Sequence, residues 1–116
     1  MAGDERVIAA SAALGERGAG VRFTVQREGR EVPAFAVRVD GVVHAYLNAC
    51  AHEGVELDWE PGEFFDEAAG DLVCASHGAT YDPPSGRCTG GPCRGRALVR
   101  VVVVERDGTV RLAAVE

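Results

Sequence analysis

Four side chains in this sequence have the chemistry of transition-metal ligands, and they occur in two closely spaced pairs. Cys50 and His52 form a Cys-x-His motif, and Cys74 and His77 form a Cys-x-x-His motif. Two thiolates offset the charge of ferric iron, whereas two neutral imidazoles leave more positive charge on the metal. This mixed set suits a two-iron cluster in which cysteines hold one iron and histidines the other. The chemistry that we expect from such a site is electron transfer.

Zinc is the first alternative, because sets of two cysteines and two histidines also bind Zn²⁺ tetrahedrally. Zinc motifs more often pair cysteine with cysteine and histidine with histidine, so two mixed pairs are unusual for zinc. A cysteine nucleophile with a histidine base is a further alternative, but it leaves the second pair unexplained. The two-iron cluster is therefore favoured, and a zinc-stabilised interaction domain is kept as the alternative.

The segments around the two motifs have the pattern of β-strands, since apolar residues alternate with polar ones or form short runs rich in valine. Asp-Gly pairs at 40–41 and 107–108 predict tight hairpin turns. Residues 4–15 fit either a short helix capped by Asp4 or an edge strand around 7–11. The expected strands span residues 21–25, 33–39, 42–48, 72–73, 97–105 and 109–114.

Each motif directly follows one of these strands, so two loops are expected to bring the ligand pairs to one point. The segment between the motifs, residues 53–73, is too long for one tight loop and must fold back on itself. Its apolar residues either cap the site or serve as ordinary loop packing. These residues are Leu57, Trp59, Phe64 and Phe65.

With these motifs the chain resembles the Rieske iron–sulfur family, most strongly over residues 48–95 and more loosely over 20–114. The resemblance implies an all-β fold, a small antiparallel β-sandwich with a cluster-binding subdomain of two loops. It implies one domain over residues 1–116 and one 2Fe-2S cluster per chain. The implied ligands are Cys50 and Cys74 on one iron and His52 and His77 on the other.

The resemblance also implies residues that surround the cluster, namely Gly78, Tyr81, Gly91 and Pro92. High-potential family members carry a serine where this chain has Ala79, and a disulfide that links the two loops. The disulfide positions here hold Val55 and Ser76. We therefore expect an intermediate-to-low reduction potential, above that of family members with phenylalanine at position 81, because a tyrosine hydroxyl stabilises the added negative charge.

Three further residues are possible ligands by type. Cys88 and Cys93 fall in the segment that corresponds, by resemblance, to the proline loop covering the cluster. We interpret them as reduced packing thiols, with a disulfide across the loop or a functional role as alternatives. His44 lies among apolar neighbours in an expected strand and is interpreted as structural.

Charge and composition limit the partners and the location. The chain has 116 residues and a net charge of −6, which disfavours nucleic acid and is compatible with docking on a basic patch of a partner protein. No apolar run is long enough to cross a membrane, and no positively charged export signal precedes the apolar residues 7–14. We expect a cytoplasmic protein without a membrane anchor.

The expected role is that of an electron-transfer protein, not an enzyme, because the sequence has no P-loop and no dinucleotide fingerprint. There is also no room for the second domain that holds the catalytic iron of a terminal oxygenase. The expected partners are redox proteins, a reductase, an oxygenase or both. The alternative is a small Rieske subunit or redox-sensing module of a larger reductase complex.

Overall fold

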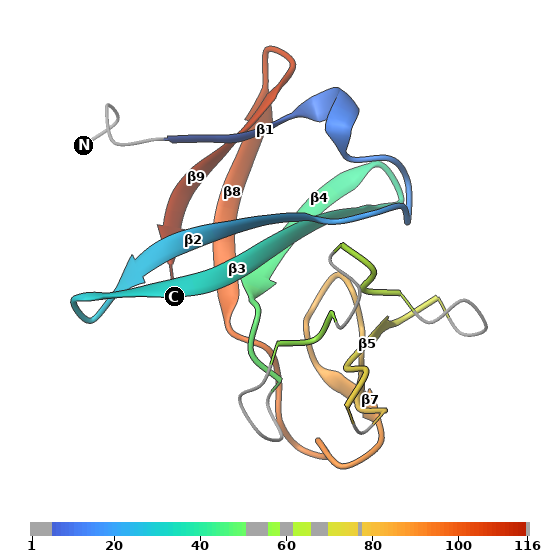
Figure 1. Cartoon of the computed structure of the whole chain (residues 1–116). Coiled ribbons are helices and arrows are strands. Elements are labelled where there is room, and N and C mark those ends of the chain that lie inside the picture. Colours follow the sequence, from blue (N-terminus) through green and yellow to red (C-terminus); the bar gives the residue numbers. More distant parts are fainter. Residues whose placement is uncertain (1–5, 51–55, 59–61, 66–69, 77, 116) are drawn as a thin grey trace.

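The computed structural model describes residues 6–50, 56–58, 62–65, 70–76 and 78–115, and it consists of two antiparallel sheets. The larger sheet has six strands in the order β1-β9-β8-β4-β3-β2, and the smaller has three in the order β5-β6-β7 (Figure 1). The strands are β1 (Arg6–Ala10), β2 (Val21–Arg27), β3 (Arg30–Val39), β4 (Val42–Leu47), β5 (Leu72–Val73), β6 (Thr80–Tyr81), β7 (Cys88–Gly90), β8 (Arg100–Arg106) and β9 (Thr109–Val115). This confirms the all-β antiparallel fold.

The long strands are joined by hairpin turns with positive φ angles. Asp40 and Gly41 have φ angles of 53° and 81°, and Asp107 and Gly108 have 53° and 76°, as the two Asp-Gly pairs predict. A third turn of this kind, which the sequence pattern does not predict, joins β2 to β3 at Glu28 (φ 53°). Register is thus set at each turn of the larger sheet.

Most expected strands differ from the prediction by one to three residues at an end, and the sequence pattern does not predict β6 and β7. The strand expected from residue 97 begins at Arg100, because Ala97 instead pairs with Arg87 in an isolated bridge. Residues 4–15 do not form the alternative helix over their described part. Arg6–Ala10 pairs with β9 as an edge strand, and a short 3₁₀ helix, η2 (Ser11–Ala13), follows.

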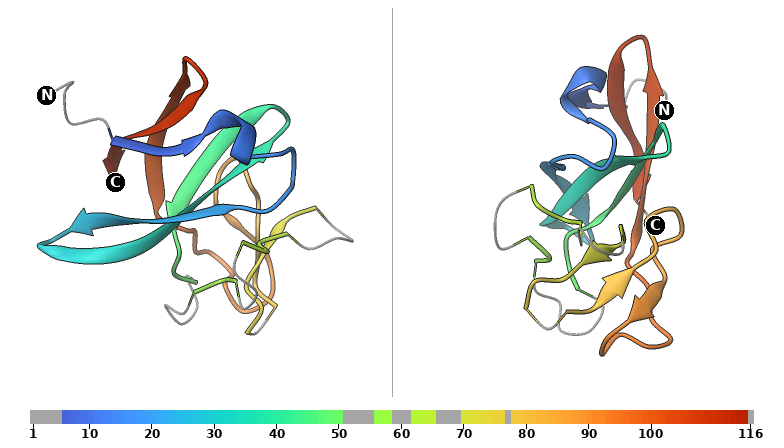
Figure 2. Two further views of the ribbon diagram at one scale, coloured as in Figure 1. Left: turned by 45° about the horizontal axis from the view of Figure 1, so that its top comes forward. Right: turned by 90° about the vertical axis from the view of Figure 1, so that its right-hand side faces the viewer.

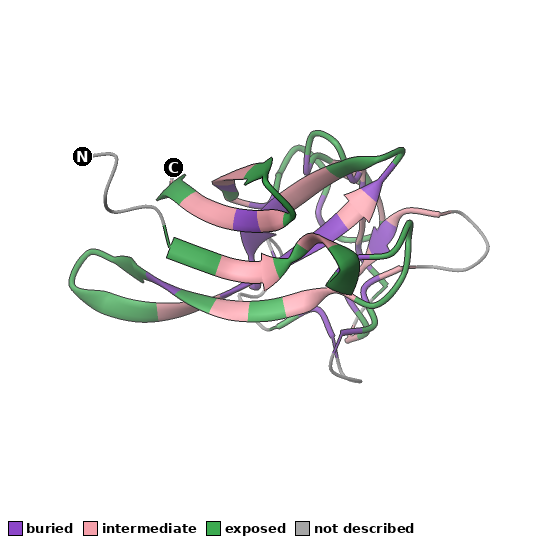
Figure 3. Ribbon diagram, turned by 90° about the horizontal axis from the view of Figure 1, so that it is seen from above, coloured by how far each residue is buried: buried purple, intermediate pink, exposed green. Residues whose placement is uncertain are grey.

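Strand β3 separates two apolar cores. Ala34 and Ala36 belong to the core within the larger sheet, whereas Phe35 and Val37 belong to the core shared with the smaller sheet. This division follows from the strand period of two. Figure 2 shows the smaller sheet and its loops as a lobe at one end of the larger sheet, and Figure 3 shows buried residues along the strands and exposed residues at the hairpin ends.

Tyr46 connects the larger sheet to this lobe. Its hydroxyl donates a hydrogen bond to the carbonyl oxygen of Pro83 at 2.5 Å, and burial raises the pKa of Tyr46 to about 12. The hydroxyl is therefore protonated at physiological pH. The ring of Tyr46 packs against Gly86, where a Cβ atom would come within 2.7 Å of it.

Gly86→Ala is therefore expected to lower the free energy of unfolding by about 2–4 kcal/mol. The methyl group overlaps the buried ring, and the φ angle of 77° at Gly86 disfavours any side chain. Denaturant unfolding measures this change. Gly29→Ala is the control, since Gly29 also has positive φ but a Cβ atom there meets nothing. An equal loss in both variants would contradict the packing explanation.

Candidate metal centre

Cys50 and Cys74 lie in the core shared by the two sheets, each just beyond the end of a strand. Cys50 follows β4 and Cys74 follows β5, and both are buried and free of disulfide bonds. They belong to one apolar cluster together with Leu57 and Phe64. Both predicted cysteine ligands therefore lie in the same apolar core. His52, His77, Val55 and Trp59 lie outside the described residues.

Backbone hydrogen bonds join the segment after Cys50 to the loop that carries Cys74. The N–H of Ala75 donates to the carbonyl of Leu57 at 3.1 Å, and the N–H of Val73 donates to the carbonyl of Phe64 at 2.8 Å. The turn after Cys74 is closed by the N–H of Gly78, which donates to the carbonyl of Cys74 at 2.9 Å. These bonds tie the segment that follows Cys50 to the loop that carries Cys74.

The approach to Cys50 is held by a buried polar network that the sequence pattern does not predict. The side-chain amide of Asn48 donates to Asp58 Oδ1 at 2.9 Å, and Asn48 Oδ1 accepts from the N–H of Leu57 at 2.8 Å. Asp58 Oδ2 accepts from the N–H of Gly62 at 2.9 Å and pairs with Arg22 Nε at 3.2 Å. The only sign of this network in the sequence is that Asn48 and Asp58 each stand between apolar neighbours.

Tyr81 lies beside the sulfur of Cys50. The two residues are buried in the same core, and the Tyr81 hydroxyl is 3.2 Å from Cys50 Sγ. A hydroxyl at this distance can donate to a thiolate, which has no proton of its own. The sequence prediction that Tyr81 serves as a donor at this site therefore has a matching geometry.

Tyr81→Phe is expected to lower the reduction potential of the holoprotein by roughly 40–60 mV. Loss of the hydrogen bond removes about 1 kcal/mol of preferential stabilisation of the more negative, reduced state, and this free energy converts to such a shift for a one-electron couple. A spectroscopic redox titration of wild type and variant measures the shift. An unchanged potential would show that the hydroxyl does not stabilise the reduced state.

Gly78 and Gly91, the two glycines predicted to surround the cluster, are required for different reasons. Gly91, with a φ angle of 79°, packs so closely on the Cys74 turn that a Cβ atom there would lie 2.9 Å from the Gly78 carbonyl oxygen. Gly78 is exposed and has a φ angle of 73°, so glycine is favoured there by the backbone conformation and not by lack of space. Pro92 is exposed next to Gly91. The loop around Gly91 therefore covers the turn that follows Cys74.

Cys88 and Cys93 form a disulfide, so their interpretation as reduced packing thiols is wrong in this structure. The intervening turn brings their Cα atoms to 5.6 Å, a separation that a disulfide spans without moving the backbone. Cys93 is fully buried in the core that holds Cys50 and Cys74. The disulfide therefore closes the covering loop on itself and does not involve Cys50 or Cys74.

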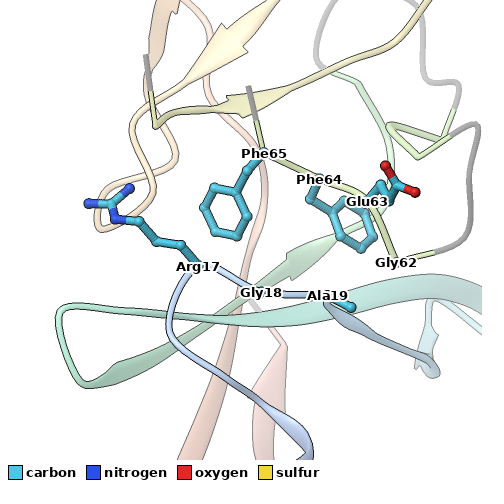
Figure 4. Close-up of a pocket in the computed structure, with 7 residues that line it drawn as sticks. All are labelled: Arg17, Gly18, Ala19, Gly62, Glu63, Phe64 and Phe65. Atoms are coloured by element: carbon cyan, nitrogen blue, oxygen red, sulfur yellow. The ribbon is translucent and has the colours of Figure 1, made fainter. Parts of the chain in front are cut away.

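Two other features, His44 and a surface hollow, are not part of the candidate metal centre. His44 is partly buried in β4, and burial, followed by the nearby charge of Arg100, lowers its pKa, which favours the neutral imidazole of a structural residue. A hollow of about 570 Å³ lies between Arg17 on one side and Phe64 and Phe65 on the other (Figure 4). None of the predicted metal ligands lines it.

The chain matches one known domain family and superposes on several solved structures. The model of the Rieske [2Fe-2S] domain matches residues 5–112. The ferredoxin of carbazole 1,9a-dioxygenase from Nocardioides aromaticivorans IC177 superposes with a TM-score of 0.71 at 22% identity, over 95% of this chain and 97% of that chain. A Sphingomonas yanoikuyae B1 ferredoxin gives 0.71 at 23%, over 94% and 97%. These two likenesses establish the fold.

A third solved structure is a much longer protein. The terminal oxygenase of carbazole 1,9a-dioxygenase from Novosphingobium sp. KA1 gives a TM-score of 0.67 at 28% identity, over 97% of this chain but only 29% of that chain. No protein with a curated description matches the chain in sequence.

The extent of the domain match shows that the chain belongs to the Rieske [2Fe-2S] family. Its cofactor is therefore a 2Fe-2S cluster, which supplies one-electron redox chemistry when bound. The residues present fit that group, because two buried cysteines outside the disulfide, on separate loops, would supply thiolates, and the Tyr81 hydroxyl lies within hydrogen-bond distance of one of them. Within the described residues, no helix is long and apolar enough to cross a membrane.

Proposed function

We propose that this protein is a ferredoxin-like carrier that passes single electrons between a reductase and an oxygenase or a second reductase. Cys50 and Cys74 bind one iron of the cluster, and His52 and His77 bind the other. The observation that supports this most strongly is that Cys50 and Cys74, both buried and outside the disulfide, belong to one apolar core. Burial of the thiolates keeps water and oxidants away from the sulfur atoms.

The partner class is supported by the similar ferredoxins. One of the similar structures is a complex of reduced oxygenase and oxidised ferredoxin in carbazole 1,9a-dioxygenase, with a TM-score of 0.70 at 22% identity. We extend that role to this chain, with no catalysis of its own. Its place is the cytoplasm, where the thiols of Cys50 and Cys74 stay reduced for cluster assembly.

An anaerobic titration of the purified holoprotein with dithionite tests this function. We expect uptake of one electron per chain, with bleaching of the visible absorption, and full recovery on addition of ferricyanide. The Cys88–Cys93 disulfide is kept out of the count by repeating the titration on the Cys88→Ala/Cys93→Ala variant. A protein that takes up no electron in either form would rule out the carrier function.

The second candidate is a Rieske component of a larger oxidoreductase complex. The observation in its favour is the 28% identity with a terminal oxygenase, in which the matched region is less than a third of the chain. Size-exclusion chromatography of the protein from its native cells separates the two. A carrier elutes at the mass of its own chain, whereas a component elutes with its complex.

A further inference from the structure

Two features of the Cys88–Cys93 disulfide are unusual for a purely structural bond. The two cysteines are only five residues apart, so the bond closes a short loop and restricts the unfolded chain less than a longer loop would. The proposed location of the protein is the cytoplasm, where thiols are kept reduced and the disulfides that do form are usually transient. Both features favour a bond that opens and closes in the folded protein.

The two cysteines differ in their access to solvent. Cys93 is 0% exposed and lies in the core that contains Cys50 and Cys74. Cys88, the first residue of β7, is only partly buried and lines a surface hollow of about 460 Å³. A reagent that approaches from the solvent therefore reaches Cys88 before Cys93.

The hollow beside Cys88 has the size of a small-molecule site. Its other lining residues are Arg87, Gly95, Arg96 and Ala97, two of which have little or no side chain. A Cβ atom built on Gly95 would meet nothing within 4 Å, so this side of the hollow is open. The volume falls in the range of about 300–1,000 Å³ that is typical of small-molecule pockets. A low-molecular-weight reagent therefore has room to approach the disulfide.

The carbonyl groups around the disulfide also suit the two reduced thiols. The carbonyl oxygen of Gly90 is 3.2 Å from Cys93 Sγ and 3.4 Å from Cys88 Sγ. The carbonyl oxygen of Thr80 is 3.6 Å from Cys93 Sγ. A disulfide sulfur has no proton to donate, whereas a thiol at either position would have an acceptor nearby. Breaking the bond therefore does not leave the buried Cys93 thiol without a hydrogen-bond acceptor.

The loop that the disulfide closes is the one that covers the turn after Cys74. Gly91 lies between the two cysteines and packs on that turn, where a Cβ atom would lie 2.9 Å from the Gly78 carbonyl oxygen. Opening of the disulfide therefore removes a covalent restraint from a segment that packs against the metal centre.

We propose that Cys88 is a site of thiol–disulfide exchange with a low-molecular-weight thiol of the glutathione type. The external thiolate enters the hollow and bonds to Cys88 Sγ, the bond from Cys88 to Cys93 breaks, and Cys93 leaves as a thiolate that takes up a proton. A second external thiolate attacks the external sulfur of this mixed disulfide and releases Cys88, which is also protonated. In total, the protein disulfide gains two electrons and two external thiols become one disulfide.

This exchange goes beyond the proposed electron transfer, because none of the proposed cluster ligands takes part in it. Only the argument from location depends on the proposed function, whereas the access to Cys88 and the burial of Cys93 do not. The dithionite titration can therefore fail while the exchange reaction is still observed, and the reverse also holds.

Two single variants of the holoprotein test which cysteine is attacked. Cys93→Ser leaves a thiol at Cys88, and Cys88→Ser leaves a thiol at Cys93. Each protein is incubated with oxidised glutathione, and the adduct is followed by intact-mass spectrometry and located by peptide mapping. We expect Cys93→Ser to gain one glutathione at Cys88, at a rate at least about tenfold higher than that of Cys88→Ser. Equal rates, or a faster reaction at Cys93, would overturn the proposal.

The wild-type holoprotein tests whether the disulfide exchanges in the folded state. An excess of reduced glutathione is added under anaerobic conditions, and the protein thiols that appear are trapped by alkylation at intervals. We expect a rate proportional to the glutathione concentration, with the iron content unchanged. A rate that does not depend on this concentration would mean that unfolding limits the reaction, and it would overturn the proposal. Reduction by a thioredoxin-type protein but not by glutathione would overturn it as well.

A pair of alanine variants tests whether the thiol enters through the hollow. Ala97→Leu places a larger side chain in the hollow, and Ala114→Leu makes the same change on β9 in the larger sheet. Both alanines are exposed and paired with an antiparallel neighbour, so the two variants are matched. We expect Ala97→Leu to slow the reduction by glutathione at least about fivefold, and Ala114→Leu to stay within about twofold of wild type. Equal rates in all three proteins would overturn the assignment of the hollow as the point of entry.

Discussion

Cys74→Ala is expected to reduce the bound iron from two atoms per chain to almost none. Cys74 is one of two thiolates assigned to the same iron, and it is fully buried in the core. A three-coordinate iron in an apolar surrounding has no water to complete its coordination, so the cluster should not assemble. Iron and sulfide analysis of the purified variant, beside its visible spectrum, measures the loss.

The matched control is Cys88→Ala/Cys93→Ala, which also removes a buried sulfur from the same core. Because these sulfurs bond to each other, the control should retain most of the iron even if the protein becomes less stable. Retention of two irons in Cys74→Ala would contradict the ligand assignment. Equal loss of iron in both proteins would show that core packing, rather than coordination, holds the cluster.

Asp58→Ala is expected to lower the free energy of unfolding by about 3 kcal/mol. The buried carboxylate accepts hydrogen bonds from Asn48 and Gly62 and pairs with Arg22. Its removal leaves two buried donors without an acceptor, which costs more than the bonds themselves contribute. Because Asn48 is two residues from Cys50, the same variant should lose iron faster to a chelator. Urea unfolding of the holoprotein and the rate of iron release are the two measurements.

Glu56→Ala supplies the control, because Glu56 pairs with the same Arg22 at the surface. Its side chain is 45% exposed, whereas that of Asp58 is 0% exposed. Exposed ion pairs contribute little, so the change should be within about 0.5 kcal/mol. Similar losses in the two variants would mean that the ion pair with Arg22, and not the buried network, stabilises the loop.

The parts of the fold that the sequence predicts are those governed by local chemistry. Asp40–Gly41 and Asp107–Gly108 form hairpin turns because these residues tolerate positive φ angles. The alternation in β3 places Ala34 and Phe35 in different cores. The two Cys–His motifs point to the metal and its class, since the ligand types carry the chemistry wherever the loops lie.

The parts that the sequence does not predict depend on contacts between distant segments. Asp58 is an ordinary loop aspartate until Asn48 and Arg22 approach it from β4 and β2. Residues 97–99 continue an apolar strand pattern, but the N–H of Leu47 donates to Val99 while Ala97 pairs with Arg87, so the strand begins later. The Cys88–Cys93 disulfide depends on the path of the turn between them, which spacing alone does not define.

Metal analysis combined with EPR spectroscopy tests the central claim most directly. The protein should be purified anaerobically, analysed for iron, acid-labile sulfide and zinc, and examined by EPR after reduction with dithionite. We predict two irons and two sulfides per chain, no stoichiometric zinc, and an EPR signal that integrates to one unpaired electron per chain. One zinc per chain, or iron without sulfide and without that signal, would contradict the assignment of the cluster to these two loops.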